Sequence, residues 1–431
     1  MKTIVWKNAT AAQKQQALAR PKAGDTRVLR ENVEAIVRDV KLRGDVAVRV
    51  YNLKFDGASR KIVRVLPQEI KAAAASLNPK LRAAIRRAKT NIEKFHKAEI
   101  PRSVKIETMP GVRCALHWRA IENIGLYIPA GTAPLFSALL MQAIPARLAG
   151  CKNIVLCSPP QRDGKVHPTV LAAAHVCGIR DVFVVGGAQA IAAMAYGTVT
   201  IPKADKIFGP GNSFVTAAKQ IVSQDPDGAA IDMPAGPSEV MVIAEASARP
   251  DWVAADLLAQ AEHDASAQAV LVTTSAGFAR KVGDEIATQL VDLPRRAIAA
   301  QSLAASRMIV VSGMAAAIEV ANLYAPEHLI IHNQDAAKYL PKIRNAGSVF
   351  LGALTPESAG DYASGTNHVL PTYGYARAYG GITVQSFMKS MTVQSLTGKG
   401  LRKLGATIVT MAEAEGLDAH ANAVKIRLGK A

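Results

Sequence analysis

Short apolar runs rich in β-branched residues recur along this 431-residue chain, and helix-like segments separate most of them. Strands that alternate with helices are typical of parallel sheets, because each helix carries the chain back to the start of the next strand. The pattern therefore predicts an α/β fold. The runs span residues 153–156, 181–185, 206–208, 239–244, 269–273, 308–311 and 329–331.

Two of the predicted strands lead directly into glycine-containing turns that precede a helix. The turns are VGGA at 185–188 and FGPGN at 208–212. Such turns bring backbone N–H groups and a helix N-terminus to an anion, such as the phosphates of a dinucleotide. Neither turn is the full GxGxxG fingerprint, so by itself each of them is better explained as an ordinary tight turn of an α/β unit.

Two polar segments combine carboxylates with imidazoles. The segment 356–368 carries Asp361 and His368 among hydroxyl and amide side chains, on a backbone with two glycines. This composition is typical of a loop that wraps a small ligand or a metal. Near the C-terminus, Glu415 and His420 flank a glycine, which by itself indicates only a helix boundary.

Two further segments place polar groups beside predicted elements. In a helix predicted from Pro250, Gln260 and His263 are three residues apart and share one face, where they could hold one metal ion. Glu327 and His328 directly precede the apolar run 329–331 and suit acid–base chemistry. Taken singly, each segment is better explained as ordinary surface or loop polarity.

Composition favours an enzyme with more than one domain. A chain of this length exceeds the usual single core, and 49% hydrophobic residues are enough for sizeable cores. No apolar run is long enough to span a bilayer, and the first residues lack a signal-peptide pattern. With four cysteines and no CxxC pair, we expect a cytoplasmic protein.

The net charge of +18 is concentrated in the first quarter of the chain. Residues 1–119 contain 27 Lys and Arg against 10 Asp and Glu. We interpret this as solvated helix faces; steering of an anionic cofactor is a second reading. A nucleic-acid role is a third, but aromatic residues make up only 5% and are not interleaved with the basic ones.

Several long motifs resemble those of the histidinol dehydrogenases of histidine biosynthesis, and the likeness extends over essentially the whole chain. They are GLYIP at 125–129, VGGAQA at 185–190, FGPGN at 208–212, DMPAGPSE at 232–239, QAEH at 260–263, PEH at 326–328 and the loop 356–371. One departure is Ala130, where the family usually has a second glycine. A methyl group there is tolerated unless the residue needs a positive φ.

The resemblance implies a zinc-dependent, NAD-linked oxidation of L-histidinol through an aldehyde to L-histidine. By motif, it implies zinc ligands at Gln260, His263, Asp361 and His420. It implies a catalytic acid–base pair at Glu327 and His328. It implies substrate contacts at Ser238, His368 and Glu415, shared with His328 and the zinc ligands. It implies NAD contacts at Tyr127, Gln189 and Asn212.

The residue types fit this chemistry. Conversion of an alcohol to an acid removes two hydrides, so two NAD molecules are used in turn. A neutral imidazole near pH 7 suits removal of the hydroxyl proton, which favours His328. A carboxylate suits activation of the water that adds to the aldehyde, which favours Glu327. Zinc has no redox chemistry, so its expected role is to orient and polarise the substrate.

The resemblance also implies the architecture: two incomplete Rossmann-like parallel-sheet domains with small helical N- and C-terminal pieces. We expect an N-terminal arm (1–25), a first domain with the zinc and catalytic residues (26–129 plus 237–381), an inserted NAD domain (130–236) and a dimerisation tail (382–431). An amphipathic helix is expected at 400–414. In an intertwined homodimer, Glu415 and His420 would complete the partner's site.

Three alternatives remain open. Aldehyde oxidation can pass through a cysteine thiohemiacetal, although we hypothesise that no cysteine here is catalytic, because those in apolar surroundings resemble core residues. A zinc hydrolase could use a similar group of ligands beside a glutamate. A two-lobed binding protein would share the fold without needing Glu327 and His328.

Overall fold

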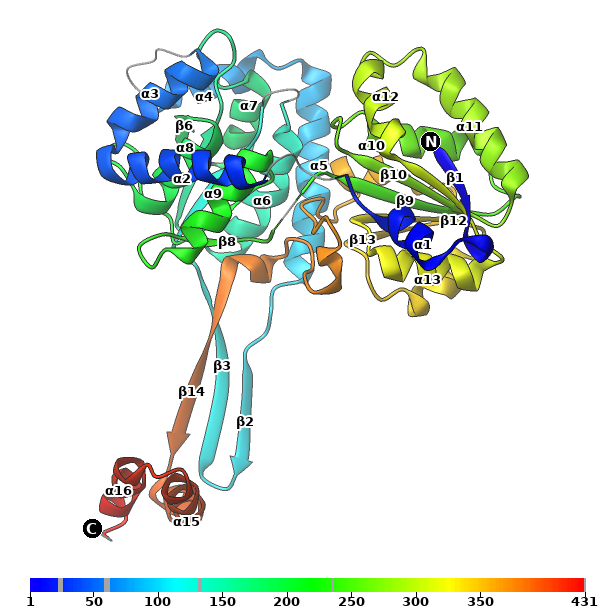
Figure 1. The fold of residues 1–431 in the computed structure, drawn as a ribbon. Helices are drawn as coiled ribbons and strands as arrows, with labels where there is room; N and C mark the ends of the chain where they lie inside the picture. The colour runs from blue at the N-terminus through cyan, green and yellow to red at the C-terminus, as the bar shows by residue number, and fades with distance from the viewer. Residues whose placement is uncertain (22–25, 58–62, 131–133, 235, 430–431) are drawn as a thin grey trace.

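The computed structural model describes residues 1–431 except 22–25, 58–62, 131–133, 235 and 430–431. Two parallel sheets form the body, and a slender antiparallel arm projects from it (Figure 1). The predicted α/β class is confirmed, and each of the seven predicted runs forms a strand. Among the described helices, none combines the length and apolarity needed to cross a membrane.

The first sheet has six strands in the order β1-β11-β10-β9-β12-β13, all parallel. Its strands are β1 (Lys2–Val5), β9 (Glu239–Ala244), β10 (Gln268–Thr273), β11 (Arg307–Val310), β12 (His328–His332) and β13 (Ser348–Leu351). Its helices are α1 (Ala11–Leu18), α10 (Pro250–Ala261), α11 (Ala276–Leu290), α12 (Arg296–Ala305), α13 (Met314–Tyr324) and α14 (Glu357–Tyr362). Strands β9 and β10 are buried along their whole length, as expected of a sheet covered on both faces.

The second sheet has five parallel strands in the order β6-β5-β4-β7-β8. They are β4 (Asn123–Tyr127), β5 (Asn153–Ser158), β6 (Asp181–Val184), β7 (Lys206–Phe208) and β8 (Ala230–Ile231). One face packs with α4 (Pro67–Ser76), α5 (Pro79–Ala98), α6 (Phe136–Ala149) and α7 (Pro168–Cys177). The other face packs with α2 (Thr26–Arg43), α3 (Asp45–Asp56), α8 (Gly187–Tyr196) and α9 (Ser213–Gln224).

This packing differs from the predicted grouping of segments. We grouped residues 26–129 with 237–381, but β4 pairs with β5 and β7, and α2–α5 cover the five-stranded sheet. Helices α2–α5 and strand β4 therefore lie with the other four strands of the five-stranded sheet. The division of the chain into domains stays a prediction.

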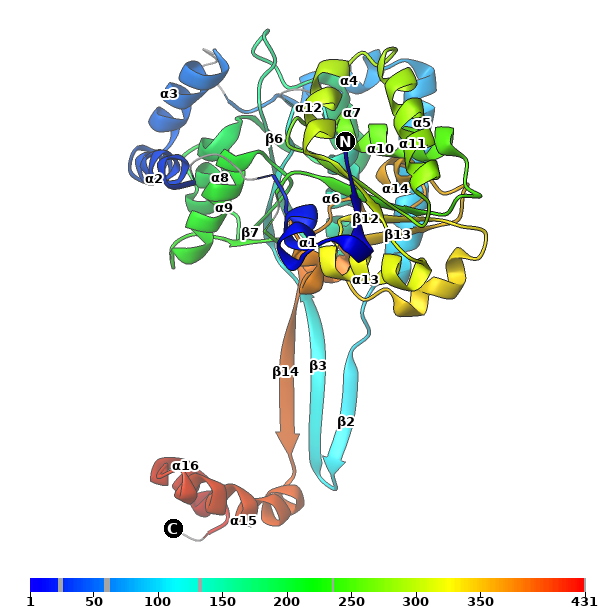
Figure 2. The same cartoon turned by 45° about the vertical axis from the view of Figure 1, so that its right-hand side comes forward.

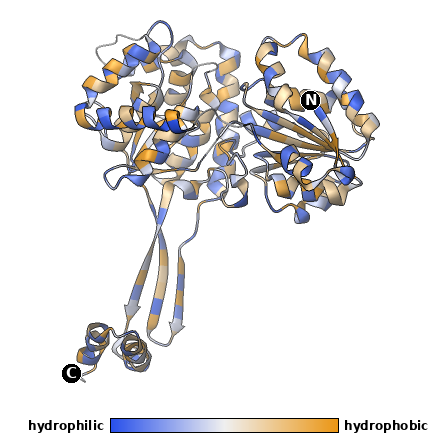
Figure 3. Cartoon of the chain, in the orientation of Figure 1, coloured by the Kyte–Doolittle hydropathy of each residue, from blue (hydrophilic) through white to orange (hydrophobic). Residues whose placement is uncertain are grey.

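The arm is a three-stranded antiparallel ribbon that ends in two helices, far from both sheets (Figures 1 and 2). Its elements are β2 (Val104–Met109), β3 (Val112–Ala120), β14 (Met388–Leu396), α15 (Gly398–Ala414) and α16 (Asp418–Arg427). The helix predicted at 400–414 is therefore confirmed within α15. Hydrophobic residues are interspersed with polar ones along the arm (Figure 3), and several large ones are exposed, including Ile106, Val393 and Ile426.

Local signals explain several helix boundaries. Thr10 forms a capping box with Gln13 at the start of α1, and the side chain of Asn212 accepts hydrogen bonds from two N–H groups at the start of α9. Proline occupies the first turn of α4, α5, α7 and α10. Short 3-10 turns lie at Trp6–Asn8, Ala336–Lys342, Tyr375–Arg377 and Val384–Phe387.

Candidate functional site

A cavity of about 120 Å³ lies between the two sheets. One wall comes from Gly209 and Pro210, which follow the carboxyl end of β7 in the five-stranded sheet. The opposite wall comes from the amino ends of β9 and β12 in the six-stranded sheet. Six of the predicted site residues line it: Ser238, His263, Glu327, His328, Asp361 and His368.

Glu327 is buried at the start of β12. Its Oε2 accepts a hydrogen bond from the backbone N–H of Glu239 at 2.9 Å, and the side chain of Ser238 also bonds to it. Burial raises the pKa of Glu327 well above its usual range. A carboxylate held this way becomes a stronger base when it ionises.

His328 lies beside three carboxylates. Its Nδ1 is 3.3 Å from Glu357 and 3.7 Å from Glu327, and its Nε2 is 3.7 Å from Asp361. Burial lowers the pKa of His328 to about 3, so the imidazole is neutral near pH 7. A neutral imidazole can accept a proton, as the prediction for this residue requires.

His263, Glu357 and Asp361 form a group of potential metal ligands. One ligand atom from each lies within 4.8 Å of the others. Gln260 is fully buried, and both polar atoms of its amide lack a hydrogen-bond partner in the described part of the chain. Burial raises the pKa of Asp361 to about 6, and a bound cation would favour its ionised form. The mixed nitrogen and oxygen donors fit a divalent cation such as zinc.

Glu357 was missed in the sequence analysis. The predicted loop at 356–368 contains the short helix α14, in which Glu357 and Asp361 are four residues apart and share one face. That spacing was the available signal. The helix predicted from Pro250 ends at Ala261, so His263 lies just beyond α10 instead of within it.

His368 is half-buried, and its ring is oriented by the backbone of Asp361. Its Nδ1 lies 2.7 Å from the carbonyl oxygen of Asp361, to which it can donate a hydrogen bond. Burial lowers the pKa of His368, so its ring is also neutral near pH 7. In this tautomer Nε2 is left as an acceptor.

The predicted NAD residues follow the carboxyl edge of the five-stranded sheet. Tyr127 ends β4, and its hydroxyl accepts a hydrogen bond from the N–H of Gly187 at 3.1 Å. Gln189 is buried in the first turns of α8, and its Oε1 has no described partner. Asn212 caps α9. Ligands of open α/β sheets bind at this edge, although these three residues do not line the cavity itself.

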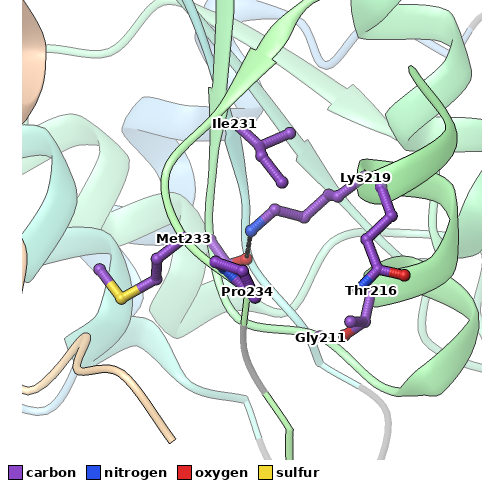
Figure 4. Close-up of a pocket in the computed structure, with 8 residues that line it drawn as sticks. Gly211, Thr216, Lys219, Ile231, Met233 and Pro234 are labelled. Carbon is purple, nitrogen blue, oxygen red and sulfur yellow. Dashed lines mark hydrogen bonds between the residues drawn. The ribbon is translucent and has the colours of Figure 1, made fainter. Parts of the chain in front are cut away.

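A buried ion pair fixes the turn at 208–212. The Lys219 ammonium bonds to the Asp232 carboxylate and to the carbonyl of Gly209 at 2.9 Å, while the N–H of Gly209 donates to Asp232 at 2.9 Å. Figure 4 shows Lys219 extending from α9 toward Met233 and Pro234, around a cavity of about 10 Å³. Both peptide groups of Gly209 are thus satisfied by one charge pair.

Glu415 and His420 lie far from the cavity of their own chain. They are exposed in the distal helical region of the arm, which projects away from both sheets (Figure 1). Among the described non-glycine residues, only Ala325 and Tyr373 have a positive φ. Ala130 therefore does not need a positive φ, and its methyl group is tolerated at this position.

The described cysteines do not line the cavity. Burial raises the pKa of Cys151 and Cys177 to about 12 and that of Cys157 even further. A thiol needs to ionise to act as a nucleophile. The geometry therefore favours the hypothesis that no cysteine is catalytic.

Comparisons with known proteins agree with the motifs. The histidinol dehydrogenase family model matches residues 19–428. A histidinol dehydrogenase of Escherichia coli (strain K12) is 52% identical over 425 residues, which is 99% of this chain and 97% of the relative. One of Aliivibrio fischeri is 50% identical over 430 residues, 100% of this chain and 97% of the relative. The crystal structure of histidinol dehydrogenase from Elizabethkingia anophelis has a TM-score of 0.95 at 50% identity and covers 100% of this chain and 98% of that one.

Proposed function

Because this chain belongs to the histidinol dehydrogenase family and is an oxidoreductase, we propose that it oxidises L-histidinol through L-histidinaldehyde to L-histidine with two NAD, in histidine biosynthesis. The observation that carries the proposal is the buried pair of Glu327 and His328 in a cavity that also holds a metal-ligand group. Because the family is one of oxidoreductases, its match over nearly the whole chain argues against the zinc-hydrolase and binding-protein alternatives.

In the first oxidation, the neutral ring of His328 accepts the hydroxyl proton while hydride leaves the carbinol carbon for NAD. In the second, Glu327 accepts a proton from water as it adds to the aldehyde, and the hydrate loses a second hydride. Burial of both groups supports these roles, because it keeps His328 neutral and makes the Glu327 carboxylate a stronger base.

Zinc fits the donor set described above. Gln260, His263 and Asp361 would hold it together with His420 from a second copy of the chain, and Glu357 is an additional candidate in the same group. When bound, zinc would supply a positive charge that orients the substrate and polarises its reacting oxygen. Ser238 and His368 would contact the substrate from the cavity wall.

NAD would bind along the carboxyl edge of the five-stranded sheet. Tyr127, Gln189 and Asn212 lie there beside two glycine turns that open α8 and α9. The N-termini of these helices suit the pyrophosphate. The turn at Gly209 also borders the cavity, which would bring the cofactor and the substrate together.

A homodimer would complete the site. Glu415 and His420 lie on the arm, too far out for their own cavity, and the arm exposes large apolar side chains that a partner would cover.

The proposed enzyme is cytoplasmic. The basic first quarter forms surface ion pairs such as Arg30 with Glu34, as expected of solvated helix faces.

The first test is stoichiometric. Zinc-loaded protein with excess NAD and limiting L-histidinol should release two NADH per histidinol, and a chelator should abolish the signal. One NADH would refute the role of Glu327 in the second step. No NADH would refute the proposed function.

Subunit complementation tests the shared site. Glu327→Gln and His420→Ala homodimers should each be nearly inactive, whereas co-expressed mixed dimers should regain activity at one of their two sites. If mixed dimers stay inactive while wild-type protein is active, the arm does not complete the partner's site.

A further inference from the structure

Arg20 lies in the N-terminal arm, two residues beyond α1, and its partly buried side chain packs against the six-stranded sheet. The side chain of Arg20 is 12% exposed and that of Glu239 is 2% exposed. The Nε and Nη2 of Arg20 donate to the two carboxylate oxygens of Glu239 at 2.5 and 2.7 Å. The guanidinium also lies over the ring of Tyr324, 4.0 Å from its centroid. A two-pronged pair of this kind fixes orientation as well as charge.

The same guanidinium holds the turn that leads to Glu327. Its Nη2 donates to the carbonyl of Tyr324 at 2.8 Å and lies 3.4 Å from that of Ala325. Ala325 has φ +54°, a left-handed conformation that side chains other than glycine adopt at a cost. Such a conformation persists only where the surroundings impose it, and Arg20 supplies part of that constraint.

Arg20 also acts on Glu327 indirectly, through Glu239. The backbone N–H of Glu239 donates to Oε2 of Glu327, and the side chain of Glu239 is held by Arg20 and by the hydroxyl of Tyr324 at 3.0 Å. That hydroxyl is also 2.7 Å from the side-chain oxygen of Gln268. Arg20 therefore contacts both segments that place the Glu327 carboxylate, yet it does not line the cavity.

We propose that Arg20 is a positioning residue for Glu327: the N-terminal arm locks the turn at 324–326 and the start of β9, and thereby orients the carboxylate in the cavity. This inference rests on the proposed function. The consequence is that loss of the arginine fork lowers turnover without weakening the binding of either substrate.

The test separates positioning from simple stability. Arg20→Met alone strands the buried charge of Glu239, so the neutral pair Arg20→Met/Glu239→Gln is the main variant. We expect its kcat for histidinol oxidation to fall about 10- to 100-fold, since small misplacements of catalytic groups have effects of this size. Its KM for histidinol and NAD should stay within about threefold of wild type. A wild-type kcat in the folded double variant would overturn the proposal.

Two further variants keep the test decisive. Arg20→Lys retains the charge but not the fork, so it should fold and show a reduced kcat with an unchanged KM; wild-type kcat here would also overturn the proposal. Arg249→Met is the matched control, because Arg249 pairs with Asp251 and lies over Trp252 but is exposed and does not line the cavity. Its kcat should be unchanged. If wild-type protein itself releases no NADH, the proposed function fails instead.

Discussion

Replacing Gly209 by alanine should disrupt the turn that forms one wall of the cavity. Gly209 has φ +128°, and a Cβ built there would lie 2.1 Å from the carbonyl oxygen of Tyr127. Real Cβ contacts are essentially never shorter than 3.0 Å, so the backbone has to move by about 0.9 Å. It cannot relax freely, because both peptide groups of Gly209 are bonded to Lys219 and Asp232. The backbone strain costs about 1–3 kcal/mol and the overpacking about 1–3 kcal/mol more.

The assay compares Gly209→Ala with Gly164→Ala. Gly164 has φ +74° but nothing within 4 Å of the added carbon, so its cost is confined to about 1–2 kcal/mol of backbone strain. We expect Gly209→Ala to melt at a lower temperature than the control and to need at least about tenfold more NAD for half-maximal rate, since 1.4 kcal/mol of lost binding corresponds to a factor of ten. Equal melting temperatures and equal KM values for the two variants would refute the reasoning.

Three further predictions concern an ion pair, a buried carboxyl and two cysteines. Lys219→Met should destabilise the protein by about 3–5 kcal/mol because it strands the buried Asp232, and Lys219→Met/Asp232→Asn should recover most of that loss in a denaturant titration. Burial raises the pKa of Asp56 to about 6, so ionisation of this carboxyl lowers the stability of the folded protein as pH rises from about 4 to 6. Asp56→Asn should therefore be more stable than wild type at pH 7.5, by about 1 kcal/mol after allowance for partial exposure. Thermal melts should show this gain shrinking toward pH 4. Cys157→Ala and Cys151→Ala should each retain wild-type kcat, and loss of the second NADH in a folded variant would contradict this.

The strands that could be predicted from sequence are those buried on both faces. Apart from Glu239 and Thr273, runs 239–244 and 269–273 are apolar, because helices cover both sides of the sheet. Strand β4 was not predicted because it contains Gly125, and a glycine weakens the sequence pattern of a strand. A Cβ built at Gly125 would lie 2.7 Å from the sulfur of Met194. Close helix packing, which is not visible in sequence, explains that glycine.

The arm strands were missed for the opposite reason. β14 is exposed along almost its whole length and β2 is exposed at nearly every position, so neither shows the alternation that marks a half-buried strand. In the proposed dimer, a second copy of the chain would cover the exposed faces of these strands. The packing of 26–129 differs from the predicted grouping because helices such as α2 carry no sequence signal for which of the two sheets they cover.

The site residues differ in how far sequence could predict them. Glu327, His328, Asp361 and His368 follow the family motifs, and the fold brings them into one cavity. Glu357 could have been found from its spacing to Asp361. Arg20 could not, because its contacts are made 219 and 304 residues away along the chain.

The cavity has one wall on each sheet, so its survival on heating depends on the contact between the sheets and not on either core. Contacts between packed units separate more easily than cores melt. Catalysis should therefore fail first, at a temperature where circular dichroism still reports both sheets as folded. The protein would thus have two thermal thresholds, with an intact but inactive state between them.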